Sequence, residues 1–163
     1  MITIRLTETE FVKCIDCAKK FRKDVEKNNR RQPGYVATAI EDYDSALNGV
    51  MSELAASKWF GIEYKYDFTY DRDRPDLING VEVKSTRVIT GHLIVESVDK
   101  FAPQILAIVH FDSNVVVLRG WRDLTDCLQQ KYYREPPEVR QASYWVPQID
   151  LCDMQLLKTK LAS

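Results

Sequence analysis

The stretch "RPDLINGVEVKST", residues 74–86, contains the pattern on which the predicted fold depends. Two valines alternate with Glu82 and Lys84, which is typical of a β-strand with one apolar and one charged face. The Asn-Gly pair before this strand is typical of a tight turn, so residues 76–88 are predicted to form a β-hairpin. Because buried charges are costly unless something compensates them, the charged face predicts a nearby partner.

Asp76 is the nearest candidate partner, and the loop between it and Glu82 decides whether the two carboxylates meet. A two-residue turn would place Asp76 opposite Val83, on the wrong face. A three-residue loop with Gly80 in the left-handed region, the G1 bulge, pairs Asp76 with Glu82 instead. We therefore predict a bulge at or beside Gly80 and a divalent metal held by the two acids.

A third carboxylate is expected from "GVMSELAASKWFG", residues 49–61. Glu53 lies beside the apolar stripe of a predicted helix that begins near Asp44 or Ser45 and stops at the glycine that ends this stretch. Gly49 is one turn earlier, and its missing side chain leaves room for a metal or phosphate. Glu53 would then complete the acidic site; a partly exposed helix position without a role is the alternative.

The rest of the chain carries helical and strand patterns. Thr7 and Glu10 have capping-box spacing and begin a predicted helix over residues 8–28. Strand patterns occupy 62–70, 92–97, 105–112 and 115–121. Further helical patterns occupy 98–102, 123–133 and about 151–161. The predicted fold class is α/β, with a mixed central sheet flanked by helices.

Length and composition predict one domain over residues 1–163, with 45% apolar and 29% charged residues. It divides into an N-terminal basic helix (1–32), a core (45–112) and a C-terminal helical segment (122–163). No apolar run approaches the roughly 18 residues that span a bilayer, and the first residues lack signal-peptide features, so no membrane partner and a cytoplasmic location are expected.

The net charge of -1 and the pI of about 6.1 argue against a protein that coats nucleic acid by bulk electrostatics. Positive charge is concentrated instead between residues 13 and 31, as expected of an element that holds a polyanion, although an ordinary solvated helix face explains it equally well. The four cysteines lack a complete zinc pattern, and reduced thiols are preferred over disulfides or a zinc site.

These motifs resemble the PD-(D/E)xK nuclease superfamily, which includes many type II restriction enzymes, phage nucleases and archaeal Holliday-junction resolvases. The resemblance covers about residues 45–112 and rests on Glu53, Pro75, Asp76, Glu82, Val83 and Lys84. It implies a restriction-endonuclease-like three-layer sandwich. It also implies a DNA endonuclease that hydrolyses phosphodiester bonds with Mg²⁺, for which Mn²⁺ substitutes.

The same resemblance implies roles for individual residues. Glu53, Asp76, Glu82 and the backbone carbonyl of Val83 would hold the metal, whose ligands are then all hard oxygens. Lys84 would orient or deprotonate the attacking water and offset charge on the phosphate.

DNA contacts are expected from two places. Ser85, Thr86 and Arg87 follow the charged strand directly and could reach phosphate oxygens, although strand residues can equally be structural. The basic helix adds Lys19, Lys20 and Lys23. Because cutting both strands at related positions calls for two sites, a symmetric homodimer is expected.

Two alternatives stay open. The charged hairpin would make only a cross-strand ion pair, worth about 0.2 to 1 kcal/mol, if it has no chemical role. A non-catalytic DNA- or protein-binding module, such as a regulator or inhibitor that keeps the fold, would need no metal.

Overall fold

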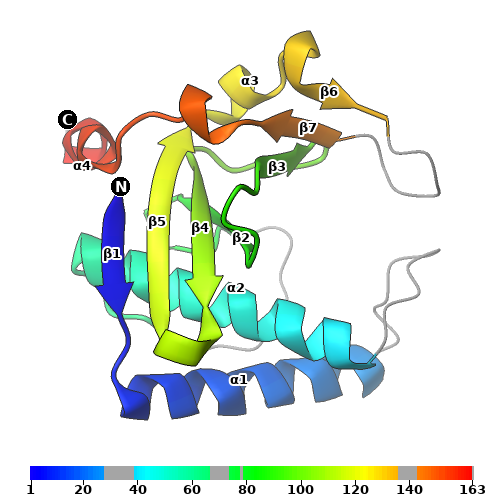
Figure 1. Cartoon of the computed structure of the whole chain (residues 1–163), viewed down its shortest axis with the longest axis vertical. Helices are drawn as coiled ribbons and strands as arrows, with labels where there is room; N and C mark the ends of the chain where they lie inside the picture. The colour runs from blue at the N-terminus through cyan, green and yellow to red at the C-terminus, as the bar shows by residue number, and fades with distance from the viewer. Residues whose placement is uncertain (28–38, 67–73, 78, 136–142, 163) are drawn as a thin grey trace.

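The computed structural model describes residues 1–27, 39–66, 74–77, 79–135 and 143–162, and its fold is mixed α/β (Figure 1). The main sheet has four strands in the order β1-β5-β4-β2, namely Ile2–Arg5, Val115–Arg122, Gln104–His110 and Glu82–Thr86. β2 pairs with β4 in parallel, and the other two pairings are antiparallel. β4 is buried from Gln104 to Val109, as expected of an apolar, β-branched central strand, and β2 is left at an edge.

One long helix, α2 (Ala39–Phe60), covers one face of this sheet, and a second, α1 (Glu8–Lys27), packs on α2. α1 begins at the predicted capping box: the Thr7 amide donates to Glu10 Oε2 at 2.7 Å, and the Glu10 amide donates to Thr7 Oγ1 at 3.2 Å. α2 lies between α1 and the sheet (Figure 1). Its buried Met51, Leu54 and Ala55 join the core formed by inward residues of β4 and β5.

A second, smaller sheet covers the other face of β4. Its strand order is β3-β7-β6, namely Leu93–Glu96, Ser143–Val146 and Tyr133–Arg134. Leu106 of β4 packs into its core with Leu93, Val95 and Val146, so Leu106 links the two sheets. α3 (Leu124–Cys127) and α4 (Met154–Ala162) complete the fold with three 3₁₀ turns: η1 (Phe111–Ser113), η2 (Gln130–Tyr132) and η3 (Gln148–Asp150).

The structure confirms several predicted elements. The first helix, the three strands predicted within 92–121 and the last helix are all present, and the second helix begins at Ala39, a few residues earlier than expected. The four cysteines, all within the described part of the chain, carry free thiols. Across the described residues, every helix is too short or too polar to cross a bilayer.

The strand predicted over 62–70 is wrong for residues 62–66, and residues 67–70 lie outside the described part. Tyr64 and Tyr66 produce the alternating pattern because both pack against the helical core, with their rings 5.0 Å apart in an edge-on pair. An extended segment lying on helices has the same period of two as a strand, so periodicity alone does not separate them.

Three helical predictions also need correction. Residues 98–102 contain no helix: the Asp99 amide closes a turn onto the Glu96 carbonyl at 3.1 Å, and Pro103 disfavours helical backbone before it. Within residues 123–133, helical structure is limited to α3 and η2, and Tyr133 begins β6. The C-terminal segment, predicted to be helical, also supplies β6 and β7, so a small sheet stands where the sandwich prediction expects a helical layer on the second face.

Candidate functional site at the edge of the main sheet

The turn before β2 has the bulge that the sequence predicts. The Gly80 amide donates to the Leu77 carbonyl at 3.0 Å, and the Leu77 amide donates to the Val81 carbonyl at 3.1 Å. Gly80 has a φ of +84°, which is the left-handed position of a G1 bulge. The expected hairpin is nevertheless only this bulged turn, because no strand precedes Glu82 in the described residues of 74–81 and β2 pairs with β4 instead.

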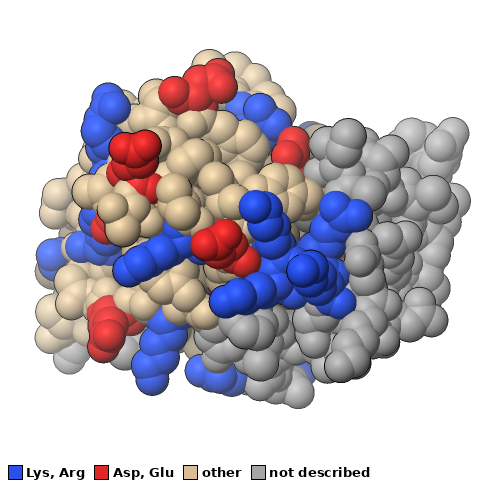
Figure 2. Space-filling model, turned by 90° about the horizontal axis from the view of Figure 1, so that it is seen from below, with Lys and Arg blue, Asp and Glu red and all other residues tan. Residues whose placement is uncertain are grey.

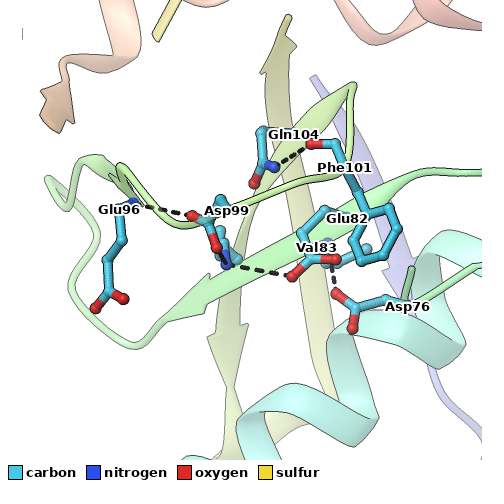
Figure 3. A network of polar contacts seen from close by, with 8 residues as sticks. Asp76, Glu82, Val83, Glu96, Asp99, Phe101 and Gln104 are labelled. Atoms are coloured by element: carbon cyan, nitrogen blue, oxygen red, sulfur yellow. Dashed lines mark hydrogen bonds and ion pairs between the residues drawn. The ribbon is translucent and has the colours of Figure 1, made fainter. Parts of the chain in front are cut away.

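Asp76 caps the free edge of β2. The Glu82 amide points inward and donates to the Pro103 carbonyl at 3.0 Å, whereas the Val83 amide points outward and donates to Asp76 Oδ2 at 2.7 Å (Figure 3). The N–H and C=O groups of one strand residue share an edge, so the Val83 carbonyl also lies on the Asp76 side.

Glu82 and Lys84 lie on the face of β2 that is turned away from α2. Lys84 is in register with Leu106, whose side chain packs on the small sheet, while Val83 faces the helices with Ile105. Lys84 Nζ is 3.2 Å from Glu82 Oε1. The predicted pair is therefore formed, and 17% of the Glu82 side chain and 28% of the Lys84 side chain remain exposed.

Asp99 is a member of this site that sequence reasoning missed. Its Oδ1 is 3.0 Å from Lys84 Nζ, and its Oδ2 accepts a hydrogen bond from the Glu96 amide at 2.9 Å (Figure 3). An aspartate three residues after the end of a strand is a turn signal. That signal was not used, because Asp99 was assigned to the helix predicted over 98–102.

Glu53 approaches the same edge from α2, on the helix side of the sheet. Tyr64 Oη donates to Glu53 Oε2 at 2.8 Å, and this contact holds the carboxylate in a largely buried position. Gly49 is adjacent to it as the helical spacing predicts, because a Cβ added there would lie 3.8 Å from Glu53 Oε1.

The site carries more negative charge than its own hydrogen bonds compensate. Burial, with a smaller effect of Asp76, raises the pKa of Glu53 to about 8. Burial and, after it, the charge of Glu82 raise the pKa of Asp76 to about 7. The hydrogen bond from the Val83 amide favours the ionised carboxylate and so acts in the opposite direction. These effects show that the three carboxylates are close enough to oppose one another's ionisation. A bound cation would relieve that repulsion.

Lys84 remains a cation in this setting. Burial alone would lower its pKa, but the nearby Asp99 and Glu82 carboxylates outweigh burial and raise the pKa above the ordinary value. Its role is therefore that of a fixed positive charge, and the deprotonated form expected of a general base is disfavoured.

The donor chemistry suits a hard divalent cation, but the ligands are not gathered. Among the described residues, no group of three or more His, Cys, Asp or Glu side chains is arranged to hold an ion. The Asp76 carboxylate already accepts a hydrogen bond from the Val83 amide, and the Glu82 carboxylate is paired with Lys84. Gln104, in register with Glu82, is fully buried, and its Oε1 has no hydrogen-bond partner, which adds a free oxygen acceptor next to the acids.

The residues expected to contact DNA fall into two groups. Ser85 and Thr86 are half-buried on β2. Arg87 is exposed, and its Nη1 is 3.0 Å from Asp44 Oδ2. The basic helix lies elsewhere: α2 separates α1 from the sheet (Figure 1), and Figure 2 shows Lys and Arg side chains gathered on the α1 side. The three lysines of this helix that were predicted to contact DNA are exposed, and they lie on a different surface from Lys84. They are Lys19, Lys20 and Lys23.

Comparison of this chain with protein-family models, with curated proteins and with solved structures finds no match.

Proposed function

We propose that this protein is a Mg²⁺-dependent DNA endonuclease of the PD-(D/E)xK type. The observation that carries the proposal is the Asp76–Val83 hydrogen bond at the free edge of β2, because it brings the aspartate of the motif beside the Glu82-Val83-Lys84 strand. The parallel pairing of β2 with β4 and the packing of α2 on the sheet are compatible with a restriction-endonuclease-like core.

The proposed metal ligands are Asp76, Glu82 and the Val83 carbonyl, with Glu53 in contact from the helix side. When bound, Mg²⁺ would lower the pKa of a water and stabilise negative charge on the scissile phosphate. Lys84 would place its ammonium against that phosphate and orient the water, and Asp99 would hold Lys84 in position. Tyr64 would fix the direction of the Glu53 carboxylate.

Cleavage of plasmid and branched DNA tests this proposal. Wild-type protein is expected to cut with Mg²⁺ or Mn²⁺ and not with EDTA, and Lys84→Met, Glu82→Gln and Asp76→Asn are each expected to lose about 100-fold or more in rate. Glu63→Gln is the matched control, because Glu63 is exposed and outside the site, and it should cut like wild type. Activity that survives in Lys84→Met and Glu82→Gln would refute the mechanism.

One observation favours the second candidate, a non-catalytic DNA- or protein-binding module. Lys84 is already neutralised by Glu82 and Asp99, and such a closed ion-pair network can serve structure alone. Calorimetric titration with Mn²⁺ separates the candidates. The nuclease is expected to bind Mn²⁺ more weakly after Asp76→Asn, whereas the binding module has no metal site for that substitution to alter.

A further inference from the structure

A hollow of about 500 Å³ opens on the same face of β2 as Lys84, between β2 and the small sheet. Its volume is in the range of sites that bind small organic groups. Lys84 itself is part of its wall, so the hollow is continuous with the proposed catalytic site. The other wall residues that matter here are Thr86, Thr90, His92, Ile94 and Trp145.

One wall is an accessible aromatic surface. Trp145 is 38% exposed, and its indole Nε1–H donates to Ser143 Oγ at 2.8 Å, which fixes the ring. His92 lies against it with ring centroids 5.9 Å apart. Ile94 is the cross-strand partner of Trp145 and is exposed beside it. A fixed, exposed indole with apolar neighbours is a stacking platform for a flat ring.

Another part of the wall is polar and is held by several contacts. Thr86, which lies on the same face of β2 as Lys84, and Thr90 line it. The loop that carries Thr90 is tied down, since the Gln148 side-chain amide donates to the Gly91 carbonyl at 2.9 Å. Gly91 also approaches Thr86 so closely that an added Cβ would lie 2.8 Å from Thr86 Cγ2. The second contact holds this loop close to Thr86 of β2.

We infer that this hollow receives an unpaired nucleobase next to the phosphate bound at Lys84. The inference rests on the proposed function and names its substrate class: DNA with an unstacked nucleotide at the cleavage position, as in a branch, bulge or single strand. A nucleobase matches both walls, because its face stacks on the indole and its edge reaches hydroxyl groups. Extruding a base costs least when that base is already unpaired, so fully paired duplex is the poorer substrate.

Binding in Ca²⁺, measured separately from cleavage, tests the inference. The probes are a short single strand and a bulged duplex with 2-aminopurine at the unpaired position, together with the matching paired duplex. Trp145→Ala is expected to weaken binding of the first two about tenfold and to change duplex binding less than twofold. Trp145→Phe should retain most of the affinity. Ile149→Ala is the control, since Ile149 is 91% exposed and is not part of the hollow.

The two proposals fail in distinguishable ways. If wild-type protein cuts DNA through Lys84 but Trp145→Ala keeps the same preference for unpaired over paired substrate, the base site is refuted and the nuclease stands. If wild-type protein never cuts but binds single strands through Trp145, the base site stands and the nuclease is refuted. Equal loss of binding to all three probes in a normally folded Trp145→Ala protein would also overturn the base site.

Discussion

Glu53 shows how burial opposes the ionisation of a single carboxyl group. Its carboxylate lies on the helix side of the sheet edge, with Tyr64 as its hydrogen-bond donor and Asp76 as a nearby like charge. The folded protein therefore binds a proton at Glu53 more tightly than the unfolded chain does. Stability from this group is present at low pH and is lost as the pH rises from its ordinary pKa of 4.5 to about 8.

Glu53→Gln should consequently raise the free energy of unfolding at pH 8.5, by about 1 to 3 kcal/mol in metal-free buffer, and change it little at pH 4. Glutamine keeps an acceptor for the Tyr64 hydroxyl, so the substitution removes mainly the charge. Urea denaturation at the two pH values measures the difference. Equal destabilisation at both would show that the charge of Glu53 carries no such cost.

At the scale of elements, β2 and the bulged turn before it place Asp76. The sequence predicted the bulge from the Asn-Gly pair and from the need to bring Asp76 and Glu82 to one place, and the hydrogen bonds of Leu77 and Gly80 confirm it. It did not predict that β2 would pair in parallel with β4, because strand neighbours are set by the packing of the whole sheet and not by local turn chemistry.

Gly80→Ala is expected to lower the free energy of unfolding by about 1 to 2 kcal/mol, since a side chain disfavours the left-handed backbone at φ +84°. Gly49→Ala is the matched control. It lies within α2, where an added Cβ meets only Glu53 Oε1 at 3.8 Å, and should stabilise the helix by about 0.5 to 1 kcal/mol. Denaturation curves that coincide for Gly80→Ala and wild type would contradict the bulge.

For the whole molecule, the basic helix and the proposed site are on separate surfaces, because α2 lies between α1 and the sheet (Figure 1). A short DNA bound at Lys84 would not extend to α1. A long DNA that bends around the molecule would contact both surfaces, and its affinity would include the electrostatic contribution of the basic helix.

The triple change Lys19→Ala, Lys20→Ala and Lys23→Ala should therefore weaken binding of a long duplex and leave binding of a duplex of about 10 base pairs unchanged. The slope of log K against log salt for the long duplex should become shallower by about 2 to 3, if each lysine neutralises one phosphate. Lys131→Ala with Lys158→Ala provides a control for lysines of other surfaces. An unchanged slope would exclude α1 from DNA binding.

The sequence by itself predicted the long helices, the central strands and the bulge at Gly80, and it singled out four residues of the candidate site, Glu53, Asp76, Glu82 and Lys84. Each of these follows from the period of apolar residues or from turn chemistry, which act over a few neighbouring positions. Only the tertiary structure decided which strand pairs with β2, that Asp99 holds Lys84, and that Trp145 of a late strand lines the same hollow as that lysine. Those contacts join segments distant along the chain, and they depend on how the layers pack around Leu106.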